Sequence, residues 1–234
     1  MFLPSVINHR QPFSPAAGPT GVSSRKPGLF IAPGCDEHPV ELPVHLDRNL
    51  AVTYGPHEMP EDRDPDNVLL QRWGGTCTGD LDWGAHQTHR QVYAMDQLRC
   101  CGCAEDPDIQ DPHVTATGFT PPGMLWLLPV GPDLTNAVWP KDVETANPPI
   151  CLRCAHRAVR ACDALQRGFI ALRVRTSEII GYYGTVYTST DPPQALEARV
   201  VKLTEPAIDR TVARQLVRRL HQAQPDPSSL ALSA

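Results

Sequence analysis

Two Cys-x-x-Cys pairs are the residues of this chain whose types and spacing best suit chemistry. Cys100 and Cys103 form the first pair, and Cys151 and Cys154 form the second after 47 intervening residues. One such pair can supply two thiolates of a tetrahedral zinc site, so two pairs can complete a closed four-sulfur site. The sequence therefore predicts a structural Zn²⁺ on these four cysteines, which stabilises the local fold and performs no reaction.

Two questions about this site stay open in the sequence. Cys101 directly follows Cys100, so either can be the ligand, although the two-residue spacing to Cys103 favours Cys100. Four thiolates can also hold an iron–sulfur cluster, and one Cys-x-x-Cys pair can do redox chemistry. Two pairs that share one ion favour zinc. Cys162, two helical turns beyond Cys154, is interpreted as a core residue.

The elements around the cysteines must bring the two pairs together. Apolar spacing predicts a helix over 88–98 that leads into the first pair. Two strands, 114–119 and 124–128, flank Pro121-Pro122-Gly123 and predict a hairpin. The second pair opens a helix that Gly168 ends. A knuckle turn, a hairpin and a helix in this order resemble the treble-clef zinc folds over about residues 98–168.

The same order also resembles nucleases of the HNH or His-Me finger kind. These proteins place a catalytic histidine and an asparagine between two Cys-x-x-Cys pairs. His113 would then activate water as the general base, Asp111 would help to hold a divalent cation, and Asn147 or Asn136 would be the asparagine. The chain lacks the Asp-His or His-His dipeptide of that motif. A histidine in a polar loop is the simpler interpretation of His113.

The C-terminal region is expected to contain strands followed by a helix. Branched and aromatic residues predict strands over 169–174, 179–187 and 199–203. Apolar residues at 208, 212, 216 and 220 predict an amphipathic helix over 207–222. Its opposite face would present Arg210, Arg214 and Arg218, either as an anion-binding surface for phosphates or simply as a solvated polar face.

The predicted fold class is α+β, with short strands around a treble-clef-like zinc centre and a C-terminal amphipathic helix. The expected parts are a disordered leader over 1–27, a β-rich N-terminal part over 28–97, the zinc module over 98–168, a strand-plus-helix part over 169–224 packed on the module, and a flexible tail over 225–234. Within the N-terminal part, residues 68–73 are expected to form a short helix.

Composition limits the classes of function. The net charge is −5 at pH 7, but residues 1–150 sum to −10 and residues 151–234 to +5. The acidic first part argues against a general nucleic-acid-coating role, and the basic C-terminal part leaves room for a local anionic contact. No apolar run approaches the ~20 residues needed to cross a bilayer, and no secretory segment is evident. We therefore expect a cytoplasmic protein with no membrane partner, in which cysteines bind metal.

The chain also resembles a group of actinobacterial zinc-binding proteins, through a PPxCxxCA-type second pair and an RQLVRRL-like segment. The matching stretches are Pro148–Ala155 and Ala213–Leu220. The resemblance implies a cytoplasmic bacterial protein and brings no activity with it. The sequence thus predicts a non-catalytic, zinc-stabilised binding or regulatory module that recognises a protein or nucleic acid. The alternative is a divergent His-Me finger nuclease.

Overall fold

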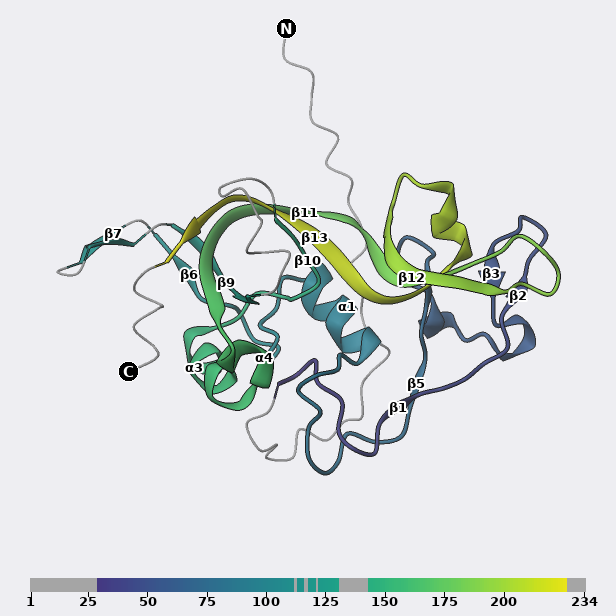
Figure 1. The fold of residues 1–234 in the computed structure, drawn as a ribbon, viewed down its shortest axis with the longest axis horizontal. Helices are drawn as coiled ribbons and strands as arrows, with labels where there is room; N and C mark the ends of the chain where they lie inside the picture. Colours follow the sequence, from purple (N-terminus) through teal and green to yellow (C-terminus); the bar gives the residue numbers. More distant parts are fainter. Residues whose placement is uncertain (1–28, 112, 116–117, 121, 131–142, 227–234) are drawn as a thin grey trace, which may run out of the picture.

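A curved sheet built around two long strands organises the chain (Figure 1). The computed structural model describes residues 29–111, 113–115, 118–120, 122–130 and 143–226, with side chains except over 112–121. The predicted leader, the last residues of the predicted tail and Asn136 lie outside the described residues. The sheet has seven strands in the order β10-β13-β11-β9-β6, with β12 beside β11 and β4 beside β13. All its pairings are antiparallel except that of β4 with β13.

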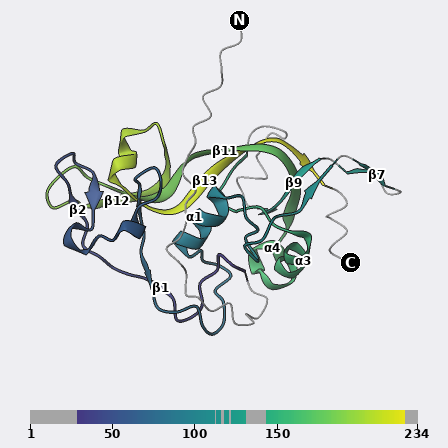
Figure 2. The ribbon, with the colours of Figure 1, turned by 180° about the vertical axis from the view of Figure 1, so that it is seen from behind.

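The two central strands are β11 (Phe169–Tyr187) and β13 (Thr211–Pro225). Their partners are β4 (Leu69–Leu70), β6 (Ile109–Gln110), β9 (Gly123–Pro129), β10 (Val143–Thr145) and β12 (Ala195–Lys202). The register of β11 with β13 shifts near Gly181 and again near Gly184. Such bulges bend a strand and increase its twist, in keeping with the arch that both strands follow in Figures 1 and 2.

The prediction of a C-terminal amphipathic helix is wrong. Residues 206–210 form a 3₁₀ turn, η3 (Pro206–Arg210), and the segment that follows is the strand β13. Leu216 faces the core opposite Tyr182 of β11, and both side chains are almost completely buried. The strand also extends to Pro225, and Asp226 is buried directly after it, so the first two residues of the predicted tail belong to the folded structure.

Helix α1 (Thr88–Asp96) covers one face of the sheet beneath the arch (Figures 1 and 2). Its apolar residues Val92 and Met95 pack with Tyr182 and Leu216 in one core cluster. The buried side chain of Gln91 bonds both backbone groups of Leu216, because its Oε1 accepts from the Leu216 N–H at 2.8 Å and its Nε2 donates to the Leu216 carbonyl at 3.0 Å. The helix therefore fastens β13 through hydrogen bonds as well as apolar contact.

The N-terminal part consists of short elements. Two small sheets pair β1 (His38–Pro39) with β5 (Trp73–Gly74) and β2 (His45–Leu46) with β3 (Val52–Thr53). Two 3₁₀ turns follow, η1 (Gly55–His57) and η2 (Pro60–Asp62). The short helix expected over 68–73 is absent: this stretch contains β4 and the start of β5, and the buried Leu69 and Leu70 join the main sheet.

The segment predicted as the zinc module is continuous with the sheet. After the first cysteine pair the chain forms β6, then the hairpin β7 (His113–Thr115) and β8 (Gly118–Thr120), then β9, which pairs with both β6 and β11. Two helices follow the second pair, α3 (Leu152–Ala161) and α4 (Asp163–Gln166). The structure is thus a mixed α+β fold with mostly strands, in which the cysteine-bearing segment packs against the end of the main sheet where β9 joins β11 (Figure 1).

Candidate metal centre

The first cysteine pair lies in a tight turn that follows α1. The Cys100 N–H donates to the Glu105 carbonyl at 2.8 Å, and the Ala104 N–H donates to the Cys100 carbonyl at 2.9 Å. Ala104 has a φ of 61°, so the chain reverses direction directly after Cys103. This knuckle aims the side chains of Cys100 and Cys103 toward the same side of the turn.

The second pair lies where α3 begins. Cys151 is the N-cap residue of α3 in extended conformation, and Cys154 lies in its first turn. The residues before it are fixed, because the Ile150 N–H donates to the Leu125 carbonyl at 3.0 Å and the Pro149 carbonyl accepts from the Cys101 N–H at 2.8 Å. Strand β9 and the knuckle therefore hold the start of α3 against the first pair.

The four sulfurs converge on one point. The Sγ atoms of Cys100, Cys103, Cys151 and Cys154 all lie within 4.8 Å of one another, and those of Cys103 and Cys151 are 3.9 Å apart. Cys100 and Cys154 are buried, while Cys103 and Cys151 are half-buried. In the part of the chain that the structure describes, this is the only group of three or more cysteine, histidine or acidic side chains that can hold a metal ion.

Hydrogen bonds favour a thiolate at the deepest of these positions. The backbone N–H groups of Cys151 and Gly102 point to Cys100 Sγ at 3.2 and 3.4 Å. The Cys154 thiol also donates to Cys100, and together these donors lower the pKa of Cys100 to about 5. The same donated bond raises the pKa of Cys154. Thiolate is the form that binds metal, so the cluster is electrostatically suited to a cation.

The position of Cys101 resolves the ambiguity between the two adjacent cysteines. Cys100, not Cys101, joins the four-sulfur group. Cys101 packs into the apolar cluster beside Ile150 and Leu125, and its burial raises its pKa well above the ordinary value. Cys162 is half-buried at the end of α3 and packs against the same cluster, as expected for a core residue.

Sequence analysis missed Gly102 and the N-terminal segment. A Cβ atom on Gly102 would lie 2.6 Å from Cys154 Cβ and 2.7 Å from Cys154 Sγ, so only glycine permits this approach. The Phe30 and Ile31 N–H groups donate to the carbonyls of Gly102 and Cys101 at 3.1 and 3.2 Å. The glycine between two cysteines in LRCCGC could have indicated a close approach at Gly102. No local pattern in the sequence indicated a contact from residues 30–31.

The residues of the nuclease alternative occupy separate elements. Asp111 is exposed directly after β6, and His113 begins β7, with its side chain outside the described part. Asn147 is half-buried, where its carbonyl accepts from Trp126 Nε1 at 2.7 Å and its N–H donates to Thr145 Oγ1 at 3.0 Å. The described side chains show no second metal-binding cluster beside them.

The three arginines predicted to form one exposed helical face do not form one, because Arg210 lies in η3, Arg214 and Arg218 lie in β13, and Arg218 is buried. Arg218 is buried and caps the end of α1 by donating to the carbonyls of Met95 and Asp96. Arg214 donates to Thr185 Oγ1 at 2.8 Å, and Arg210 ends η3. Arg218 therefore has a structural role in joining α1 to β13.

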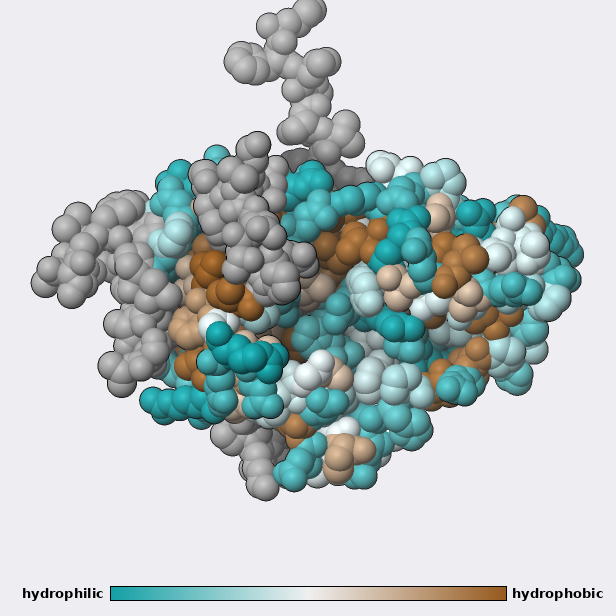
Figure 3. Space-filling model, in the orientation of Figure 1, coloured by the Kyte–Doolittle hydropathy of each residue, from teal (hydrophilic) through white to brown (hydrophobic). Residues whose placement is uncertain are grey.

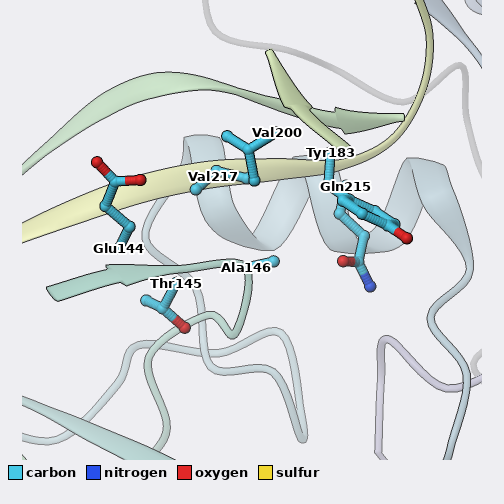
Figure 4. Close-up of a pocket in the computed structure, with 7 residues that line it drawn as sticks. All are labelled: Glu144, Thr145, Ala146, Tyr183, Val200, Gln215 and Val217. Atoms are coloured by element: carbon cyan, nitrogen blue, oxygen red, sulfur yellow. The ribbon is translucent and has the colours of Figure 1, made fainter. Parts of the chain in front are cut away.

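A pocket of about 190 Å³ lies on the sheet away from the cysteines, and Figure 4 shows its lining residues: Glu144, Thr145, Ala146, Tyr183, Val200, Gln215 and Val217. The Glu144 carboxylate is neutralised by Lys202 at 2.5 Å and Arg219 at 2.9 Å. Gln215 Nε2 lies 2.7 Å from His86 Nδ1, and burial lowers the pKa of His86 to about 4. The pocket thus combines apolar walls with two polar side chains, Glu144 and Gln215, that already bond neighbouring side chains outside its lining.

Comparisons with known proteins identify no relative. No family model, curated protein or solved structure matches this chain. Among the described helices, none is both long enough and apolar enough to cross a membrane. The geometry of the cysteine cluster is therefore the observation from which a function can be argued.

Proposed function

We propose that Cys100, Cys103, Cys151 and Cys154 hold one structural Zn²⁺, and that the protein is a non-catalytic binding module stabilised by this ion. The observation that supports the proposal is the convergence of four sulfurs from two segments that are far apart in the sequence. The knuckle turn, the β6–β9 hairpin and helix α3 would form a treble-clef-like centre around the ion.

The size of the cluster supports a single ion. Four sulfurs about 2.3 Å from a central Zn²⁺ lie about 3.8 Å apart at the corners of a tetrahedron. The 3.9 Å separation of the Cys103 and Cys151 sulfurs is close to that value, and no pair exceeds 4.8 Å. In an iron–sulfur cluster the thiolates bind different iron atoms and must lie further apart.

The ligand set supports a structural rather than a catalytic role. A catalytic zinc keeps one coordination position open for water or substrate, whereas four thiolates leave none. Cys100 and Cys154 are also buried beneath the knuckle and α3. The ion would then join α3 to the knuckle, and recognition of a protein or nucleic acid would fall to surfaces that it fixes. Thiols remain reduced in the cytoplasm, where we expect the protein to act.

Metal content of the purified protein tests this proposal. Mass spectrometry should find one zinc per chain in the wild type and none in Cys151→Ser/Cys154→Ser, which should also unfold more readily because the two segments lose their link. Cys162→Ala is the matched control: it removes a neighbouring thiol outside the cluster and should keep the zinc.

Three results would contradict the proposal. A wild type without metal would exclude the site, and equal zinc in the wild type and the double serine variant would place the ion elsewhere. Divalent-cation-dependent cleavage of DNA that His113→Ala abolishes would favour the nuclease alternative instead.

A further inference from the structure

Helix α3 has two chemically distinct faces. Cys154, Ala155 and Ala158 are buried on one side, where they pack with Ile150 and Leu165. Arg153, Arg157 and Arg160 are exposed on the other. At 3.6 residues per turn, these three positions lie within about 60° of one another around the helix axis and span about 10 Å along it. They form a straight row of positive charge, which we name the arginine row.

No acidic side chain of the described residues neutralises the arginine row. Helix α3 contains no acidic residue, and within the described part of the chain none of the three arginines forms an ion pair. Other arginines are engaged, as Arg63 is with Glu58 and Arg90 with Glu37. Strongly hydrophilic side chains project from the surface over α3 and α4 (Figure 3). Arg157 and Arg160 are therefore free to meet an external anion, whereas Arg153 also hydrogen-bonds Cys103.

The surroundings of the row favour a polyanion over a protein partner. Protein interfaces usually contain an apolar centre, and none of the exposed large apolar residues of the described chain (Leu50, Met59, Ile109, Val130 and Leu196) lies on α3. The helix has no Phe, Tyr or Trp on which an unpaired base could stack, and only the half-buried His156 offers an aromatic ring. Each strand of a duplex carries one phosphate per about 3.4 Å of helix axis, so a 10 Å length of duplex offers about one phosphate of that strand to each of the three arginines.

We propose that the arginine row of α3 binds the phosphate backbone of double-stranded nucleic acid without distinguishing its sequence. This inference rests on the proposed function, because Cys151 and Cys154 would fix the first turn of α3 through the metal. Arginine suits the contact, since its planar guanidinium can bond two phosphate oxygens at once. Arg153 also hydrogen-bonds Cys103, so Arg157 and Arg160 are the cleaner positions to change.

Fluorescence anisotropy with the zinc-loaded full chain and two unrelated 20-base-pair DNA duplexes tests the inference. Both duplexes should bind with similar affinity. Three phosphate contacts predict that the affinity falls about 40-fold between 50 and 200 mM salt. Arg157→Gln/Arg160→Gln should keep its zinc, bind at least about tenfold more weakly at 50 mM salt, and lose only about 3.5-fold over the same range, as one contact predicts.

Matched variants separate the row from general charge. Arg48→Gln/Arg175→Gln removes the same charge from exposed residues outside α3. Arg48 lies in the turn between β2 and β3, and these strands are at the other end of the molecule from α3 (Figure 1). This variant should bind the duplex like the wild type. Arg157→Lys/Arg160→Lys keeps the charge and should keep the wild-type salt dependence.

The inference would be wrong if the zinc-loaded wild type bound no duplex, or if both glutamine double variants lost equal duplex affinity. It would also be wrong if polyglutamate displaced the duplex at equal charge, because that result would indicate an acidic protein partner. A protein that holds one zinc but ignores DNA refutes this inference and leaves the proposed function standing. A protein without zinc refutes the proposed function itself.

Discussion

At the scale of single residues, the metal centre depends on how closely the knuckle backbone approaches the second cysteine pair. Gly102 leaves room for Cys154, and its N–H points to Cys100 Sγ at 3.4 Å. A side chain at this position would push the two pairs apart, although it would remove no ligand. Gly102 is therefore a positioning residue whose loss should affect metal affinity before it affects the rest of the fold.

Gly102→Ala should weaken zinc binding about ten- to hundredfold, because overpacking a filled site costs about 1–3 kcal/mol. Competition with a chromophoric chelator measures this affinity. Gly84→Ala is the control, since Gly84 is exposed and its added Cβ would meet only Asp82 Oδ1 at 3.3 Å. Unchanged affinity in Gly102→Ala would contradict the close approach at the knuckle.

The sequence was sufficient to predict that the two cysteine pairs meet, because Cys-x-x-Cys spacing is a local property of the chain. The spacing favoured Cys100 over Cys101 but left the choice open, since it depends on which sulfur the N–H groups of Gly102 and Cys151 face. The sequence also could not show the hydrogen bonds from the N–H groups of Phe30 and Ile31 to the knuckle, because contacts between distant segments leave no periodic pattern.

At the scale of elements, β13 shows why a periodic pattern can mislead. Ile208, Val212, Leu216 and Leu220 are four residues apart, which places them on one face of a helix. Four is also a multiple of two, so the same spacing fits one face of a strand. Arginine, glutamine, leucine and alanine favour a helix locally, but the register with β11 along almost the whole strand overrides that weak preference.

Gln91 provides a test of how α1 is joined to β13. Gln91→Ala should lower the free energy of unfolding by about 2–6 kcal/mol, because it leaves the buried N–H and carbonyl of Leu216 without this partner at about 1–3 kcal/mol per group. Chemical denaturation measures the change. Gln97→Ala, at the end of the same helix, loses only a bond to Asp96 and should change stability little. Equal losses in both variants would contradict the bridging role of Gln91.

At the scale of the whole molecule, separate segments are joined at two buried polar centres. One is the cysteine cluster, where the knuckle meets α3. The other is the fully buried Arg173 of β11, which donates to Asp108 at 2.5 Å and to Asp226 at 2.8 Å. The second centre connects the chain just before β6 with the residue that follows β13. Both centres join residues that are far apart in the sequence. Local patterns could therefore predict the α+β class but not the order of the strands in the sheet.

The central claim is that two segments separated by 47 residues meet at a single zinc ion, and X-ray absorption at the zinc edge tests it most directly. The purified protein should show one shell of four sulfur atoms at about 2.3 Å, with no nitrogen or oxygen ligand. A shell that contains nitrogen or oxygen, or fewer than four sulfurs, would contradict the closed site of Cys100, Cys103, Cys151 and Cys154.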